Sequence, residues 1–285
     1  MRYCGRDFTA EEFDLIRALL ARLPPLNRAQ LSREVCARLN WRRPDGRLKD
    51  MSCRVAMLRM QTDGLFILPP PRNPKPVAYR SYPHIEQAVL EPASIPAIEL
   101  ATLSVDLVCN KADSLLWNAY IERHHYLGHQ LMPGAQLRYF VRAAGHIVAA
   151  LGFGASAWKV KPRDQLIGWT IEQRKRNLHL IVNNARFLIL PWIRCKNLAS
   201  RILALTAKRL PDDWQASYAY RPVLLETFVE KPRFTATCYK AANWQLLGDT
   251  QGRGKLDTLH RNAQPIKSIW IYPLARNFQR HLCKT

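Results

Sequence analysis

The sequence predicts an α+β protein of two domains, a small helical domain followed by a mixed α/β domain around a central sheet. Residues 1–75 hold three short stretches with apolar side chains at helical spacing. Prolines then interrupt every regular pattern, and after residue 106 strand-like alternation mixes with helical stretches. We therefore expect a helical domain at 1–75, a proline-rich acidic linker at 76–105 that packs on the second domain, and an α/β domain at 106–285.

The first domain shows clear helix boundaries. Thr9 and Glu12 form a capping box before a first helix, and Asn27 caps a second. A third helix is expected from about 49 to 62. Three of its apolar residues recur at helical spacing and are expected to face the core: Met51, Val55 and Leu58.

The segment after the third helix predicts a wing. Gly64 ends the helix, and the apolar run 65–68 before three prolines reads as one short strand. Three helices followed by a strand and a basic loop are typical of a winged helix-turn-helix domain. A plain three-helix bundle is the alternative.

The charge of the chain points to a polyanionic partner. Lys and Arg number 43 against 22 Asp and Glu, which gives a net charge of +21 and a pI of about 10.1. Residues 40–80 alone hold nine basic and three acidic residues. Clustered charge of this kind favours DNA. The side chains expected to contact it are Arg42, Arg43, Arg47, Lys49, Arg54, Arg59, Arg72, Lys159, Arg163, Arg253 and Lys255.

Composition argues against other classes. The first residues lack the apolar core of a signal peptide, and the longest apolar run, 187–193, is far shorter than the ~18–20 residues of a membrane span. Seven scattered cysteines form no Cys-x-x-Cys pair. We expect a cytoplasmic protein with reduced thiols, no membrane contact and no metal site.

The second domain is expected to begin with a helix and a strand pair. The elements expected in chain order are a helix at 113–123, strands at 137–143 and 146–153, a short strand at 165–170, a buried central strand at 186–193, a helix capped by Asn197 and ended by Pro211 and Trp214, and a final strand, helix and strand.

The last part of the chain resembles the GCN5-related N-acetyltransferase (GNAT) fold. Its motifs are Leu-Leu-Glu-Thr-Phe-Val-Glu (224–230), a helix ending at Asn-Trp (243–244), and Leu-Leu-Gly-Asp (246–249) before a Gly-Arg-Gly loop. The resemblance implies that Tyr239 is a proton donor and that acyl-CoA is the cofactor to consider. It places the coenzyme pyrophosphate at Arg194, Lys196 and Asn197, where the family's glycines are missing. A tyrosine buried for packing is the alternative role of Tyr239.

Other polar residues lie where chemistry is conceivable. Glu226 follows an apolar run and is a candidate general base with a raised pKa, or else one half of a structural ion pair with an arginine. His125 lies in a histidine-rich loop and is a further catalytic candidate; a DNA contact and an ordinary surface or capping role are the alternatives. Asn183 and Asn184 come just before the expected central strand, where their amides could contact a base edge or an acyl carbonyl.

Longer motifs resemble the DruA family. They are Gln-Leu-Arg-Tyr-Phe-Val (136–141), Gly-Ala-Ser-Ala-Trp-Lys-Val-Lys-Pro-Arg-Asp (154–164), the run 178–192, and Asn-Leu-Ala-Ser-Arg-Ile-Leu (197–203). The resemblance implies a role in Druantia anti-phage defence or in mobile elements.

The function that we expect is DNA binding. A helicase or transposase is the expected partner, since the chain holds no nucleotide-binding Gly-x-x-x-x-Gly-Lys-Ser/Thr motif. Acyl transfer to a nucleic-acid-associated substrate is the alternative. A metal-dependent nuclease or transposase, using Asp164, Glu226, Glu230 and Asp249, is a second alternative.

Overall fold

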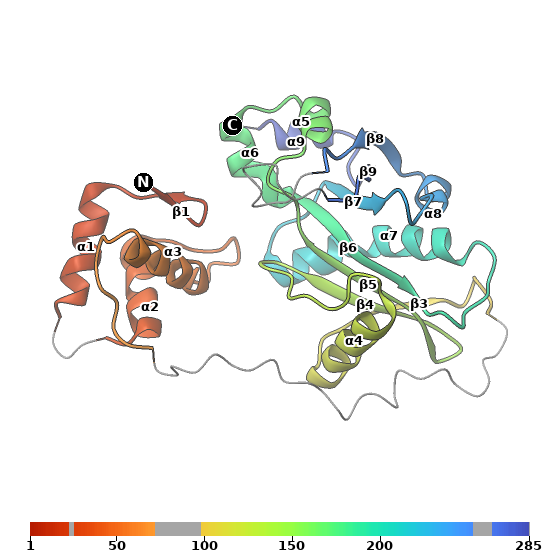
Figure 1. Ribbon diagram of the computed structural model, residues 1–285, viewed down its shortest axis with the longest axis horizontal. Helices are drawn as coiled ribbons and strands as arrows, with labels where there is room; N and C mark the ends of the chain where they lie inside the picture. The colour runs from red at the N-terminus through yellow and green to blue at the C-terminus, as the bar shows by residue number, and fades with distance from the viewer. Residues whose placement is uncertain (23–25, 72–97, 253–263, 285) are drawn as a thin grey trace. The chain divides into compact units, whose positions relative to one another are not determined.

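The computed structural model describes residues 1–22, 26–71, 98–252 and 264–284. The chain divides into two compact units, 1–81 and 82–285. The first is red to orange in Figure 1, and the second runs from yellow to blue. Most of the expected linker, and the predicted DNA contacts Arg72, Arg253 and Lys255, lie outside the described residues.

The first unit is built on the three predicted helices. They are α1 (Ala10–Leu20), α2 (Arg28–Arg38) and α3 (Asp50–Thr62), and two short strands precede them, β1 (Arg2–Tyr3) and β2 (Arg6–Asp7). The predicted capping box of Thr9 with Glu12 begins α1, and Asn27 accepts hydrogen bonds from the first turn of α2. Ile16, Leu31 and Met60 have no exposed surface and form the centre of the core.

Our prediction of which face of α3 lies in the core is wrong. Met51, Val55 and Leu58 are 56%, 41% and 41% exposed. The buried face is instead Cys53, Ala56, Met57 and Met60, which also recurs at i, i+3, i+4 and i+7. Both faces have apolar residues at helical spacing, so the side that packs on α2 and the rest of the core decides which one is buried.

The prediction of a wing strand at 65–68 is also wrong. The end of this segment hydrogen-bonds to side chains of α3 and α2 rather than to a neighbouring strand. The Leu68 N–H donates to Gln61 Oε1 at 2.8 Å, and Arg28 Nε donates to the Pro69 carbonyl at 2.6 Å. A hairpin forms elsewhere, between α2 and α3. We call residues 41–49 the basic hairpin: Arg42 bridges Leu48, and the Arg43 N–H donates to the Arg47 carbonyl at 2.7 Å.

A mixed sheet of seven strands organises the second unit. Its strands are β3 (Ser104–Leu107), β4 (Leu137–Ala143), β5 (His146–Ala155), β6 (Ile181–Ile189), β7 (Leu224–Glu230), β8 (Gln245–Asp249) and β9 (Lys267–Pro273). The strand order is β3-β4-β5-β6-β7-β9-β8, and every neighbouring pair is antiparallel except β6 with β7. The central strand begins at Ile181, earlier than expected, so Asn183 and Asn184 lie inside it. It ends before Pro191, which has no N–H to donate to a ladder.

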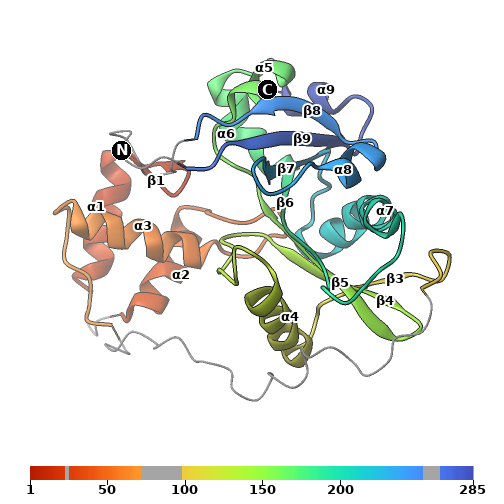
Figure 2. The ribbon, with the colours of Figure 1, turned by 45° about the vertical axis from the view of Figure 1, so that its right-hand side comes forward.

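Helices cover both faces of this sheet (Figure 2). The helix α4 (Lys111–His124) packs on one face, where the Trp117 indole donates to the Leu151 carbonyl at 3.1 Å. A Cβ added to Gly152 would lie 3.0 Å from the Trp117 ring, so this close approach requires glycine. The other face is covered by α7 (Leu198–Tyr218) and α8 (Thr237–Ala241).

Two helices stand where one short strand was expected. They are α5 (Lys161–Ile167) and α6 (Ile171–Asn177), followed by a 3-10 turn (Leu178–Leu180). Gly168, with φ of +75°, ends α5, and a capping box of Thr170 with Gln173 begins α6, so local turn chemistry overrides the strand-like pattern. Both helices gather with α9 (Phe278–Leu282) at one end of the sheet (Figure 1).

The helix α7 does not end at Pro211. It continues to Tyr218, because Leu210 and Trp214 on either side of the proline are buried in the core. Tyr218 then anchors the end of the helix by donating to the Gln136 carbonyl at 2.7 Å. None of the helices in the described ranges is long and apolar enough to cross a membrane.

Candidate functional site

The site lies where β6 and β7 part. These parallel strands pair only over three residues each, and the last pair is Asn183 with Glu226. Beyond it β6 stays with β5 and β7 stays with β9, so the two strands diverge. The register of β6 against β5 shifts at this point, which leaves Ala185 as a bulge. Bulges commonly re-aim backbone groups beside functional sites.

Tyr239 lies on α8, as predicted, and points into this divergence. Its hydroxyl donates to Asn184 Oδ1 at 2.8 Å, and the Thr227 hydroxyl donates to the Asn184 carbonyl at 3.0 Å. Burial raises the pKa of Tyr239 well above its usual range. A buried hydroxyl already bound to an amide oxygen fits the packing role better than that of a ready proton donor. The group that binds the Tyr239 hydroxyl is the Asn184 side chain.

Glu226 is the half of an ion pair that we gave as its alternative role. Both its side chain and that of Arg163 are fully buried, with Arg163 Nη1 2.8 Å from Glu226 Oε2. The Ala157 N–H also donates to Glu226 Oε1 at 2.8 Å. Burial raises the pKa of the Glu226 carboxyl, while Arg163 and this N–H lower it. On balance the pKa of the carboxyl is raised, as the sequence predicts, and both of its oxygens already accept hydrogen bonds.

The same pair corrects a predicted DNA contact. Arg163 has no exposed surface, and besides Glu226 it binds the Ala157 carbonyl and Asp164. A guanidinium enclosed in this way cannot reach a phosphate. From the first turn of α5, Arg163 holds this helix to β7.

His125 lies at the end of α4, on the sheet face opposite Tyr239. Its Nδ1 accepts a hydrogen bond from the Leu127 N–H at 3.2 Å. Burial, with the positive charge of Arg186 nearby, lowers the pKa of His125 to about 4. The imidazole is therefore neutral at pH 7, and its ring stacks on Tyr126 with centroids 4.9 Å apart.

Sequence reasoning missed the side chains that surround Tyr126. Phe234 meets its ring edge-on at 5.2 Å, and the Arg233 guanidinium lies 4.9 Å from the ring centroid.

Arg186, the one charged residue of β6, donates from Nε to the Gly128 carbonyl at 3.4 Å. A single charge within an otherwise uncharged strand was the signal that could have identified Arg186.

The turn between β6 and α7 carries the three residues predicted to hold a coenzyme. Arg194, Lys196 and Asn197 are all exposed. Asn197 does not cap α7 with its side chain, contrary to our expectation, because its backbone is left-handed with φ of +62°. This is a conformation that glycine adopts freely and asparagine tolerates. The backbone shape that a glycine would give is therefore present without the glycine.

The remaining predicted DNA contacts differ in exposure. Arg42, Arg43, Arg47, Arg59 and Lys159 are exposed. Lys49 is half-buried before α3, and the half-buried Arg54 pairs with Asp50 at 3.1 Å. Arg54 is thus less available to DNA than the arginines of the basic hairpin.

The carboxylates considered for a nuclease do not converge. Asp164 pairs with Arg163 and Arg174, Glu230 with Arg233, and Asp249 with Lys231. Among the described residues no group of three or more His, Cys, Asp or Glu side chains could hold a metal ion.

Solved structures with a similar fold are N-acetyltransferases. A polyamine N-acetyltransferase from Drosophila melanogaster is 15% identical over 60% of this chain and 99% of its own, with a TM-score of 0.38. The spermidine/spermine N-acetyltransferase SpeG from Vibrio cholerae is 10% identical over 64% and 98%, with a TM-score of 0.40. The putative acetyltransferase yncA from Salmonella typhimurium, solved with its cofactor acetyl-CoA, is 9% identical over 61% and 95%, with a TM-score of 0.38.

The strand order, with a single parallel pair that diverges, is that of a GNAT-like fold. The likeness extends to the fold alone. Residues 75–263 match the family of the Druantia protein DruA, and the chain belongs to that family. No curated protein sequence matches the chain.

Proposed function

We propose that this protein binds DNA in anti-phage defence or in a mobile element and uses its GNAT-like domain as a scaffold rather than as an enzyme. The observation that carries the proposal is the basic hairpin. Its turn presents Arg42, Arg43 and Arg47 to solvent, and Arg59 is exposed on the helix that follows. Arginines on a rigid hairpin beside a helix suit phosphate and groove contacts.

The hairpin takes the part of the wing in this proposal. In a winged helix-turn-helix domain the basic wing follows the third helix, whereas here the hairpin precedes it. Arg42 stiffens the turn, since its Nη1 donates to the Gly46 carbonyl at 2.9 Å and its Nε donates to Asn40 Oδ1 at 3.0 Å. Arg43 and Arg47 are then the side chains best placed for DNA.

The GNAT-like site supports a scaffold role. Its candidate base is neutralised by Arg163, and its candidate acid is bound to Asn184. A helicase or transposase would supply the energy-consuming or strand-cutting step in the same system.

Fluorescence anisotropy with a labelled duplex tests the proposal. Replacing Arg43 and Arg47 together with Gln should weaken binding about tenfold or more, because two charged phosphate contacts are lost. The matched control replaces Arg17 and Arg22, two exposed arginines in and after α1, with Gln. Equal affinity of both double variants and the wild type would contradict the role of the hairpin.

A second function, acyl-CoA binding and acyl transfer, is favoured by one observation. The phosphate loop of GNAT enzymes usually reads Gln/Arg-x-x-Gly-x-Gly/Ala. Asn197, in the left-handed conformation, stands at its first glycine, and Ala199 stands at the last position, where alanine also occurs. The first turn of α7 could then direct backbone N–H groups toward a pyrophosphate. Thermal unfolding with and without coenzyme A tests this function, which requires a rise in the unfolding temperature.

A further inference from the structure

A second strongly basic surface lies on the GNAT-like domain. It is formed by α6 and by the segment around α9. Within residues 168–180 and 264–284 the only acidic residue is Glu172. Six exposed side chains make up what we call the α6–α9 surface: Lys175, Arg176, Arg276, Arg280, His281 and Lys284.

Side-chain amides of α6 fix the two segments together. Asn177 donates from Nδ2 to the carbonyls of Leu282 and Lys284 at 2.9 and 2.7 Å, and Gln173 donates from Nε2 to the Cys283 carbonyl at 2.5 Å. These bonds satisfy the free carbonyls at the end of α9. Because residues 173 and 177 are one turn apart, the seam between the helices runs along one side of α6. Lys284 is thereby held beside α6.

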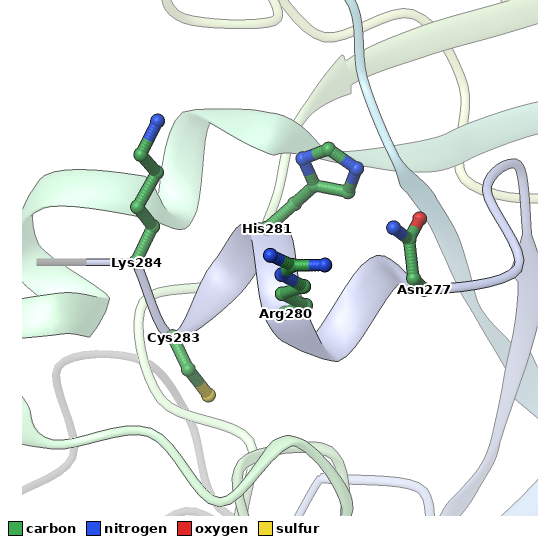
Figure 3. Close-up of a pocket in the computed structure, with 5 residues that line it drawn as sticks. All are labelled: Asn277, Arg280, His281, Cys283 and Lys284. Atoms are coloured by element: carbon green, nitrogen blue, oxygen red, sulfur yellow. The ribbon is translucent and has the colours of Figure 1, made fainter.

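The surface is hollowed where it meets solvent. Asn277, Arg280, His281, Cys283 and Lys284 line an open pocket (Figure 3). Asn277, His281 and Lys284 extend to the same side of α9, while Cys283 turns the other way, where its thiol approaches the Ile167 carbonyl at 3.3 Å. No described acidic residue forms an ion pair with the six side chains of the surface. Uncompensated like charge favours a polyanionic ligand.

An exposed aromatic ring adjoins α6. Trp158 is 47% exposed, and the Arg174 guanidinium lies 5.3 Å from its ring centroid. Arg174 is itself held by Asp164 at 3.2 Å, so the indole is anchored to α6 while much of its surface stays open. An exposed indole beside a cationic track is a feature of single-strand binding, in which bases stack while phosphates are neutralised.

We propose that the α6–α9 surface binds the phosphate backbone of a single-stranded nucleic acid, with Trp158 stacking on a base. The site rests on the proposed nucleic-acid function and adds a second contact to it, independent of the basic hairpin. The helices α5, α6 and α9, which pack at one end of the sheet, would thus build a nucleic-acid surface on an acetyltransferase-like scaffold.

The test compares two full-length variants that lose the same charge. The surface variant carries Lys175→Gln, Arg176→Gln, Arg280→Gln and Lys284→Gln. The control carries Lys111→Gln, Arg123→Gln, Lys208→Gln and Lys240→Gln, which are exposed on α4, α7 and α8. Affinity for a labelled single-stranded oligonucleotide is measured at several salt concentrations, and thermal unfolding confirms that both variants are folded.

We expect the surface variant to lose about tenfold or more in affinity. The slope of log K against log salt should become less negative by about 2–3, because each of the four lost contacts contributes ~0.7. The control should bind within about twofold of the wild type. Trp158→Ala should weaken single-strand binding more than duplex binding. Equal losses in the surface variant and the control, or an unchanged surface variant, would overturn the site while leaving the hairpin proposal standing. A wild type that binds no nucleic acid would overturn both.

Discussion

Arg163 and Glu226 form a fully buried ion pair, with Arg163 Nη1 2.8 Å from Glu226 Oε2. The pair ties α5 to the last residue of β7 that pairs with β6. Replacing Arg163 with Met should destabilise the protein by about 3–5 kcal/mol, since an unpaired carboxylate would remain buried. Urea unfolding measures this change. Arg17→Met, which removes an exposed pair with Asp14, should cost less than about 1 kcal/mol. Similar small losses in both variants would show that Glu226 is solvated.

The pair also predicts a rescue. In the double variant Arg163→Met with Glu226→Leu, neither charge of the pair remains buried, so much of the lost unfolding free energy should return. The double-mutant cycle then gives a large coupling free energy between the two sites. Additive losses would contradict direct pairing.

Tyr239→Phe separates packing from chemistry. Removing the hydroxyl leaves Asn184 Oδ1 without its buried donor, and we expect a loss of about 1–3 kcal/mol in unfolding free energy. DNA binding should be unchanged. An acyl-transfer activity that is present in the wild type and absent in a folded Tyr239→Phe protein would contradict the scaffold role.

Asn197 tests the turn before α7. Asn197→Gly should be tolerated or slightly stabilising, whereas Asn197→Val should cost about 1–2 kcal/mol because a β-branched residue resists the left-handed conformation. Thermal unfolding with coenzyme A then tests the second function. Any protection should survive in the glycine variant and be lost in the valine variant.

His125 predicts a pH dependence. Its pKa is lowered to about 4 in the folded protein, below the ordinary value of 6.5. As pH falls from about 6.5 toward 4 the unfolded state takes up a proton that the folded state refuses, so stability should decline across this window. His125→Asn keeps an acceptor for the Leu127 N–H but cannot titrate there. Stability of this variant should therefore depend less on pH, and equal pH profiles would contradict the lowered pKa.

Sequence patterns identified most elements of the fold, because they depend on local signals. Helix caps such as Thr9 and Asn27 depend only on residues nearby in the chain. The same holds for the tight turn between β4 and β5, formed by Ala144 and Gly145. The buried face of α3 depends instead on which side α2 can approach. The sequence predicts a helix end at Pro211 because the packing of Trp214 in the core is not visible in the sequence.

The sequence indicated which polar residues could matter at the candidate site but not their partners. Glu226 and Tyr239 lie beside the divergence of β6 and β7, whereas His125 lies at the end of α4. Which arginine would meet Glu226 could not be known, since Arg163 is far away in the chain and only the packing of α5 brings it near. Because this contact buries Arg163, the residue is not available to contact DNA.

Nucleic-acid binding through exposed cations is tested most directly by the affinity of the unmodified protein for a DNA duplex, measured as salt rises from about 50 to 200 mM. Binding through six or more phosphates predicts a linear fall of log K with log salt and a loss of about a thousandfold or more over this range. A flat titration, or no binding at the lowest salt, would contradict the account.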